Sequence, residues 1–333
     1  MTPVAAPVAF SAMTWDAALE ETLSRATGRP SATTSTGSVY SVHRRAVNVL
    51  LVDRLIAVVS AELDDAPWSI RLSPADWSRL DLRPGAAAHA EPDGIRLATA
   101  DGEVLIRLTG GIAWTPYQAD LGHLEPADLV WALDLLAPYR ETAPQTPFGR
   151  ASAALLTAGV DGLREAILDV FRVGIDGIPA SMDRLIGLGE GLTPSGDDVI
   201  TGFAFVAAQR GMALNRVVPS LAASVRSRAS HTTALSLATT SSALEGRGRQ
   251  RMHDLARAVS ALDADALRDA AGRTLAIGHS SGADMLTGMR LALELEARVR
   301  ATASAPRRPQ VPPLTPPVHR PHPVTRSPKK ENT

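Results

Sequence analysis

The sequence predicts an α+β fold, in which a β-rich N-terminal module precedes a mainly α-helical domain. Three observations support this prediction. Short runs of strand character fill residues 31–120, Ala- and Leu-rich segments with helical spacing fill 121–300, and two motifs rich in glycine and aspartate stand where helices of the second part begin. A helix and a connector are expected over 1–30, and the proline-rich tail over 301–333 is expected to be disordered.

The N-terminal elements follow in order along the chain. Apolar spacing over residues 14–27 predicts a helix with Thr14 as its cap. Strand character follows in "VYSVHRRAVNVLLV", "LIAVVSA" and "WSIRL". Two alternating runs around Asp101 and Gly102 predict a β-hairpin. Helical spacing then begins at "EPADLVWALDLLAPYR", where a proline suits the first turn of a helix.

Composition excludes several classes of chemistry. The 333 residues contain no cysteine, which removes disulfides, thiolate nucleophiles and cysteine-bound metals. The only lysines are Lys329 and Lys330, so the glycine-rich stretch is no Walker-A loop and a Schiff base lacks its amine. A formal net charge of −1 gives no general attraction to nucleic acid or to an anionic membrane. Without a long apolar run or a basic leader, we expect a cytoplasmic protein.

One eight-residue signature occurs twice. Residues 195–202 read "SGDDVITG" and residues 281–288 read "SGADMLTG". In each copy a glycine-rich turn leads into an apolar helix, whose first N–H groups suit an anion. Ser195 and Ser281 either bind such a ligand or cap their own helices. If the copies pair across a pseudo-twofold axis, one ligand could lie between both helix starts.

The aspartates of the signature differ in what they suggest. Asp198 aligns with Asp284 and could belong to a shared scaffold, whereas Asp197 faces Ala283 in the alignment. Asp197 is therefore the better candidate for a base, a hydrogen-bond acceptor or a metal ligand. With Asp198 it could hold Mg²⁺ together with ligand phosphates, although the sequence establishes no cofactor.

Basic and polar side chains elsewhere could complete an anion site. His231 and Thr232 begin an apparent helix just after Arg226 and Arg228, a set that suits a phosphate or a capped helix with solvated arginines. His279 precedes the second signature and is either structural or catalytic. On an alternating strand His43 and Arg45 would share one face, where Arg45 either receives an anionic substrate or remains an exposed charge.

These strings are similar to a known family. "GLGEGLTPSGDDVITGF", "HTT" and "GHSSGADMLTGM", with "HRRAVNVL" near the N-terminus, resemble the AllH-like family over roughly residues 37–298. The resemblance implies a subunit of oxamate carbamoyltransferase, which converts oxalurate and phosphate to oxamate and carbamoyl phosphate in allantoin breakdown, or a subunit that acts on a related ureide, with carbamoyl phosphate bound at the glycine-rich helix starts. The partners it implies are carbamoyl phosphate, an oxamate-like acid and the other subunits of the enzyme. The matching signature positions are Gly187, Gly189, Gly191, Thr193, Pro194, Gly196, Asp197 and Asp198.

Two alternatives stay open beside a carbamoyltransferase. One is a noncatalytic scaffold or regulatory subunit, in which the glycines pack helices together and no pocket adjoins Asp197. The other is a metal-dependent hydrolase of small amides or ureides. The candidate catalytic residues are Asp197, Asp198 and His279. The candidates for binding substrate or phosphate are Gly187, Gly189, Gly191, Thr193, Ser195, Gly196, His231, Thr232, Ser281, Gly282, Asp284 and Arg45.

Overall fold

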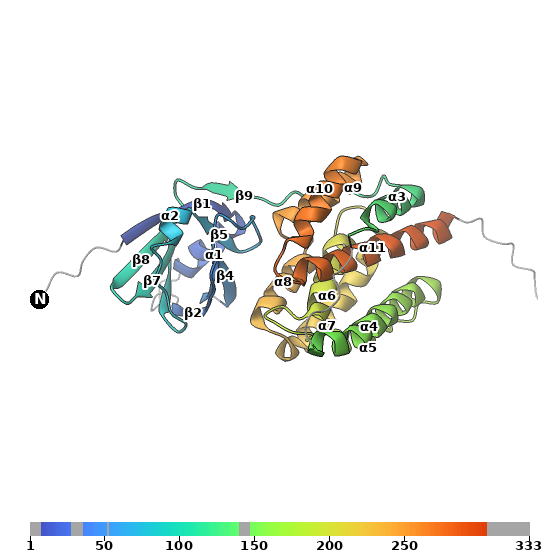
Figure 1. Ribbon diagram of the computed structural model, residues 1–333, viewed down its shortest axis with the longest axis horizontal. Helices are drawn as coiled ribbons and strands as arrows, with labels where there is room; N and C mark the ends of the chain where they lie inside the picture. The colour runs from blue at the N-terminus through green and yellow to red at the C-terminus, as the bar shows by residue number, and fades with distance from the viewer. Residues whose placement is uncertain (1–7, 28–35, 52, 140–146, 305–333) are drawn as a thin grey trace, which may run out of the picture.

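A barrel of strands and a unit of packed helices lie side by side (Figure 1). The computed structural model describes residues 8–27, 36–51, 53–139 and 147–304. The strands all precede residue 115, and nearly all of the helical residues follow residue 125. The predicted α+β class, with a β-rich N-terminal part and a mainly helical second part, is confirmed. Among the described residues, no helix is long and apolar enough to cross a membrane.

Eight strands close into the barrel and a ninth extends its edge. The hydrogen-bonded order is β5-β4-β3-β2-β6-β7-β8-β1-β9, and an additional antiparallel pairing of β1 with β5 closes the cylinder. The predicted hairpin is the antiparallel pair β7 and β8, joined across Asp101. The strands are β1 (Val8–Asp16), β2 (Thr36–Val42), β3 (Ala46–Leu51), β4 (Arg54–Ser60), β5 (Ser69–Leu72), β6 (Ala87–Glu91), β7 (Gly94–Thr99), β8 (Gly102–Arg107) and β9 (Ile112–Trp114).

The N-terminal strand corrects the sequence expectation. Local spacing predicts a helix from residue 14, but β1 runs to Asp16 and α1 (Ala18–Thr27) begins two residues later. Asp16 takes the place expected for Thr14 at the helix start, because its Oδ1 accepts a hydrogen bond from the N–H of Ala18 at 3.2 Å. Strand β1 pairs with segments more than fifty residues away, so its partners are not visible in local spacing.

Period-two alternation sorts the side chains of β3 and β4 between the two sides of the barrel wall. Val47 and Val49 of β3, and Ile56 and Val58 of β4, are buried in the barrel core. The residues between them face outward, toward the helical unit. Helix α1 adds two leucines to the same core and packs against β6.

The helical unit is built around α6 and α11, which pack closely against each other. Helix α6 is buried from Gly196 to Ala207, so the other helices surround it. Helix α11 extends to Ser304, past the start predicted for the tail at 301; the rest of that tail lies outside the described residues. The helices after α1 are α2 (Pro74–Trp77), α3 (Pro126–Leu136), α4 (Pro147–Arg172), α5 (Ile178–Met182), α6 (Ser195–Ala207), α7 (Val218–Ser227), α8 (Ala234–Leu244), α9 (Gln250–Ala261), α10 (Ala264–Leu275) and α11 (Ser281–Ser304), with short 3₁₀ turns at Ala213–Val217 and Ala229–His231.

The segment that leads into α9 holds the two units together. Arg247 Nη2 donates to both oxygens of buried Asp16, at 2.7 and 2.6 Å. Arg249 Nη2 lies 2.7 Å from Asp64 Oδ1. Trp114 at the end of β9 donates through Nε1 to Oε1 of Gln250 at 2.7 Å. These contacts fix the outer face of the barrel opposite the helical unit, so a cavity between the two has defined walls.

Candidate functional site

The glycine-rich loop before α6 requires glycine where the backbone makes close approaches. Gly187 has φ of 76°, and a Cβ there would lie 2.1 Å from the carbonyl oxygen of His231. Gly189 has φ of 126°, and its Cβ would lie 2.5 Å from the backbone nitrogen of Ser195. A side chain at either position would therefore disrupt the turn. The loop is thus pressed against both the 230 region and the start of α6.

The buried side chain of Asp197 holds this loop in place through hydrogen bonds. It is 3% exposed, and its Oδ1 accepts a hydrogen bond from the N–H of Gly187 at 3.0 Å. The hydroxyl of Thr232 donates to the other oxygen. Burial raises the pKa of Asp197 above its usual range, although the bonds from Thr232 and Gly187 act in the opposite direction. Asp197 and Thr232 therefore position the loop.

The two signature copies meet as a reciprocal pair. A Cβ on Gly202 would lie 1.9 Å from the carbonyl oxygen of Met285, and a Cβ on Gly288 would lie 2.0 Å from that of Val199. Gly202 and Gly288 occupy the same position of the signature, and so do Val199 and Met285. Each helix thus contacts the other through equivalent residues, as a pseudo-twofold arrangement requires. The absence of a side chain at both glycines permits this close crossing.

The same arrangement brings the two helix starts together. Thr193, just before α6, lies 2.9 Å from Ser281, the first residue of α11, measured between Oγ1 and Oγ. Neither hydroxyl caps α6, because its N-cap is Pro194 and makes no side-chain bond. The pair of hydroxyls, which we call the hydroxyl pair, therefore marks the junction of both signatures.

Buried carboxyl groups stand behind the hydroxyl pair. Asp198 is 2% exposed, and its Oδ2 has no hydrogen-bond partner among the described residues. Burial raises the pKa of Asp198 to about 8; hydrogen bonds from Ser281 and Thr193 act in the opposite direction, and the charges of Asp284 and Asp197 raise it further. Asp198 is therefore largely protonated at neutral pH. The effect of the Asp284 charge on the pKa of Asp198 is consistent with the two equivalent aspartates being near one another.

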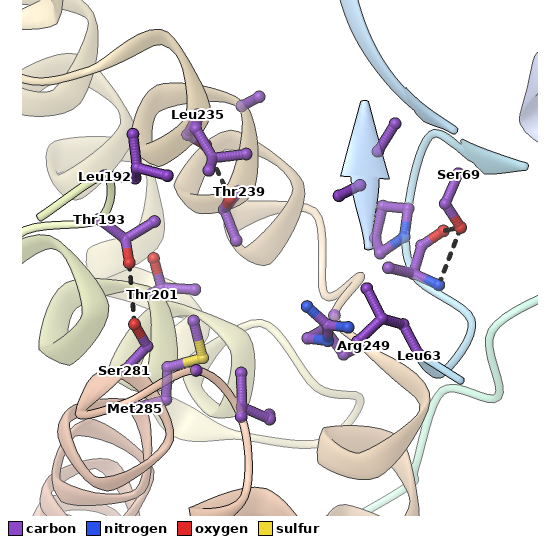
Figure 2. Close-up of a pocket in the computed structure, with 18 of the residues that line it drawn as sticks. Leu63, Ser69, Leu192, Thr193, Thr201, Leu235, Thr239, Arg249, Ser281 and Met285 are labelled. Carbon is purple, nitrogen blue, oxygen red and sulfur yellow. Dashed lines mark hydrogen bonds between the residues drawn. The ribbon is translucent and has the colours of Figure 1, made fainter. Parts of the chain in front are cut away.

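A cavity of about 520 Å³ opens between the barrel and the helical unit, beside the hydroxyl pair. Figure 2 shows Thr193, Ser281 and Thr201 on the helical side and Arg249 across the space, next to Leu63 of the barrel side. The walls include the outer face of β3 and β4, one stripe of α8, and the loops that precede the two signatures. The cavity thus depends on residues from both halves of the chain.

The structure brings together only some of the residues predicted for the site. Gly191, Thr193, His279 and Ser281 line the cavity. Asp198 and Asp284 lie behind the hydroxyl pair, and Asp197 with Thr232 lies behind the loop. The predicted residues outside the lining are Gly187, Gly189, Ser195, Gly196, Asp197, Asp198, His231, Thr232, Gly282, Asp284 and Arg45. Several of these shape the loops that carry the lining residues.

The arginines considered from the sequence lie elsewhere. Residues 43–45 form a turn between β2 and β3, so the expected strand face shared by His43 and Arg45 is wrong. His43 lines the cavity, whereas Arg45 is half exposed and pairs with Glu62 at 3.9 Å. Arg228 pairs with Asp183 on the surface, through Nε at 2.7 Å. Neither Arg226 nor Arg228 lines the cavity.

Sequence reasoning missed the two arginines that do line it, Arg247 and Arg249. Both follow Gly246 and Glu245 in a short Arg- and Gly-containing stretch, a weak local signal in an arginine-rich chain. Burial acts to raise the pKa of Asp64, but the charge and hydrogen bonds of Arg249 hold that pKa below its usual range. The Arg249–Asp64 pair is therefore charged at neutral pH and gives the barrel side of the cavity a fixed guanidinium.

No metal centre is apparent in the described part of the chain. Residues 8–27, 36–51, 53–139 and 147–304 contain no group of three or more His, Asp or Glu side chains placed to hold an ion. Both oxygens of Asp197 already accept hydrogen bonds. A role for Mg²⁺ through Asp197 and Asp198 stays a prediction.

Two family models match the chain in its two halves. The model described as AllH family N-terminal domain matches residues 11–112, which form most of the barrel. The model described as Oxamate carbamoyltransferase subunit AllH matches residues 185–293, which include both signatures and the helical wall of the cavity. No solved structure matches the chain. With both halves matched in order, the chain belongs to the AllH family of oxamate carbamoyltransferase subunits.

Proposed function

We propose that this subunit binds carbamoyl phosphate at the hydroxyl pair and takes part in carbamoyl transfer to or from a ureide such as oxalurate. The observation that carries the proposal is the junction itself. Two helix starts meet with Thr193 and Ser281 2.9 Å apart, and both residues line one cavity. The paired helix starts bring two hydroxyl groups and the positive ends of two helix dipoles to the same small space, which suits the phosphate of the ligand. The family's activity supplies the reaction class.

Protonation of Asp198 favours an anion at this junction. A second negative charge directly behind the hydroxyl pair would repel a phosphate, but the carboxyl group with a pKa of about 8 is largely neutral at pH 7. Thr193 and Ser281 can then turn their protons toward phosphate oxygens. In the transfer step the acceptor nitrogen bonds to the carbamoyl carbon, the carbon–oxygen bond to phosphate breaks, and the nitrogen's proton leaves with the phosphate. The donors would stabilise charge on the phosphate as that bond breaks.

Arg249 is the residue that we propose holds the carboxylate of the second substrate. Its Nε and Nη2 donate to Asp64, and its Nη1 makes no hydrogen bond to the described residues. The guanidinium lies across the cavity from the hydroxyl pair (Figure 2). An oxamate-like acid could therefore be held with its nitrogen directed toward the carbamoyl group. In this proposal Arg249 binds the anionic substrate, which is the role suggested for Arg45 from the sequence.

A noncatalytic subunit is the second candidate, and particular contacts favour it. Gly202 and Gly288 pack helix against helix, and the lining of the cavity does not include Asp197. The scaffold hypothesis anticipates both facts. The polar junction at the cavity wall favours ligand binding instead, because tight packing alone needs no hydroxyl pair there. In either case the other subunits of the carbamoyltransferase are the proposed partners, in ureide catabolism and in the cytoplasm.

Calorimetric titration of the full chain with carbamoyl phosphate separates the two candidates. We expect saturable binding, and at least about tenfold weaker binding by Thr193→Val, because the variant keeps the shape of the side chain and loses a donor to a charged group. Thr157→Val, which alters an exposed threonine on α4, is the matched control and should bind like the wild type. A folded wild-type chain that binds no carbamoyl phosphate would support the noncatalytic subunit.

A further inference from the structure

The outer face of β4 beside the cavity is apolar where a solvent-exposed face would be polar, while on β3 the buried Asn48, paired with Ala57, adds one amide to the lining. Leu55, Ala57 and Val59 alternate along β4 and line the cavity, while the residues between them enter the barrel core. Ala46 lies on the neighbouring strand β3 and lines the cavity as well. Because alternate strand residues on an open surface are normally polar, this face is built to contact something apolar.

Helix α8 presents a matching stripe from the other side. Leu235, Ala238 and Thr239, followed one turn later by Ser242, share one face of the helix and line the cavity. Thr239 donates its hydroxyl hydrogen to the carbonyl oxygen of Leu235 at 2.7 Å. Because that hydroxyl is already bonded to the helix, Thr239 contributes its methyl group to the stripe. Figure 2 shows Leu235 and Thr239 on the helical side, with the strand of the barrel across the space. The space between β4 and α8 is therefore a mainly apolar slot, whose lining also includes the side chains of Asn48 and Ser242.

The two small acids of the proposed reaction leave this slot unexplained. Every carbon of carbamoyl phosphate and of oxamate is a carbonyl or carboxyl carbon, so neither molecule has a saturated group to bury. A cavity of about 520 Å³ is in the range that encloses a larger, drug-sized ligand. Apolar walls without an apolar ligand would have to enclose poorly bonded water, which is unfavourable.

We propose that the carbamoyl acceptor of this subunit carries an apolar substituent, which lies in the slot between β4 and α8 while its carboxylate contacts Arg249. This inference rests on the proposed function, since it names the class of acceptor for the same site. The acceptor is thus an amide or ureide acid with an alkyl or similar side chain. Oxamate occupies only the polar part of the cavity.

Paired titrations with oxamate and N-butyloxamate test the slot. The two probes share the amide carbonyl and the carboxylate and differ only in the alkyl group. Each buried methylene favours binding about fourfold, so N-butyloxamate should bind at least about tenfold more tightly than oxamate. Equal affinities would overturn the inference.

Matched substitutions locate the effect. Ala238→Phe fills the slot from α8 and should remove the preference for N-butyloxamate. Ala57→Leu fills it from β4, on the opposite wall, and should have the same effect. Circular dichroism shows whether each variant folds. Ala158→Phe makes the same change as the first variant on the exposed surface of α4 and should keep the preference. A preference retained in both slot variants would overturn the inference. Carbamoyl phosphate is titrated separately, so failure of the proposed function is distinguished from failure of the slot.

Discussion

Asp198 shows how one buried residue couples the site to pH. Its carboxyl group has a pKa of about 8 in the folded chain because burial disfavours the charged form. In the unfolded chain the same group titrates near its ordinary pKa of 3.8. Between these values the folded state binds one more proton than the unfolded state, so the free energy of unfolding falls as pH rises. The contribution of Asp198 is fully present below the unfolded pKa and is lost as pH approaches 8.

His253 affects the pH dependence of stability in the opposite direction from Asp198, and at lower pH. It is fully buried, and burial lowers its pKa to about 4 from the ordinary value of 6.5. Its Nε2 accepts the N–H of Gly248 at 3.0 Å, so the neutral ring is part of the fold. Stability from this group is present above pH 6.5 and is lost as pH falls toward 4. The window from pH 6.5 to 8 therefore lies above the range in which His253 changes the stability.

The residue-scale prediction concerns Asp198→Asn. The wild type should lose stability from pH 6.5 to 8 with an additional slope of up to about 1.4 kcal/mol per pH unit, and the variant should lack that slope because asparagine does not ionise. Urea unfolding at half-unit steps of pH measures it. Asp265→Asn, which alters a carboxyl group 96% exposed in its side chain, is the control and should leave the wild-type slope unchanged. Parallel curves for the wild type and Asp198→Asn would contradict the buried, protonated carboxyl group.

At the scale of elements, the crossing of α6 and α11 organises the helical unit. The crossing uses two equivalent glycines, and each faces backbone of the other helix. A backbone carbonyl cannot rotate away as a flexible side chain can. Any side chain at these positions would separate the helices and displace the loops that carry the hydroxyl pair.

Gly202→Ala tests this crossing. Because the new Cβ would lie 1.9 Å from the carbonyl oxygen of Met285, we expect a loss of about 3 kcal/mol or more in the free energy of unfolding. Gly272→Ala on α10 is the matched control: a Cβ there would have no neighbouring atom within 4 Å, and alanine is favoured over glycine in a helix by about 0.5–1 kcal/mol. Urea denaturation compares the two. Equal and small effects would show that α6 and α11 do not cross so closely.

At the scale of the whole molecule, the position of the barrel depends on a short segment of the helical unit. Arg247 reaches Asp16, whose side chain is 1% exposed, and Arg249 reaches Asp64. Asp16 also accepts the N–H of Trp68 at 2.6 Å, so the arginine joins a network that shapes the barrel. These ion pairs join two separately packed cores on either side of the cavity.

Arg247→Met tests the junction. The variant leaves the buried carboxylate of Asp16 without its cation, which should lower the free energy of unfolding by at least about 2 kcal/mol. Arg268→Met, which breaks an exposed pair with Asp265, should cost about 0–1 kcal/mol. Scanning calorimetry and urea unfolding monitored by tryptophan fluorescence measure both. If Arg247→Met is as stable as Arg268→Met, the ion pair does not hold the units together.

Local sequence alone is enough to predict a strand-rich first part and a helical second part, the β7–β8 hairpin, and the glycine-rich loops before α6 and α11, but it does not predict strand β1. These features depend on neighbours in the chain: alternation, helical spacing, and glycines in turns such as Gly187 and Gly189. It also identifies Thr193, Ser281 and His279 as candidates, and all three line the cavity. The family signature follows from the same local strings.

Long-range contacts set how the barrel closes, which residues face the cavity and which lie behind it. Strand β1 finds its partners in β5 and β8, and Thr193 meets Ser281 across 88 positions of sequence. Nothing in the local sequence distinguishes Arg249 from Arg45 or Arg228, because the direction of an arginine side chain depends on the carboxylate that the fold brings beside it. Local sequence also does not show that Asp197 lies away from the cavity, because its position depends on hydrogen bonds from Gly187 and from the distant Thr232. Local periodicity determines the elements, whereas contacts between distant segments determine the site.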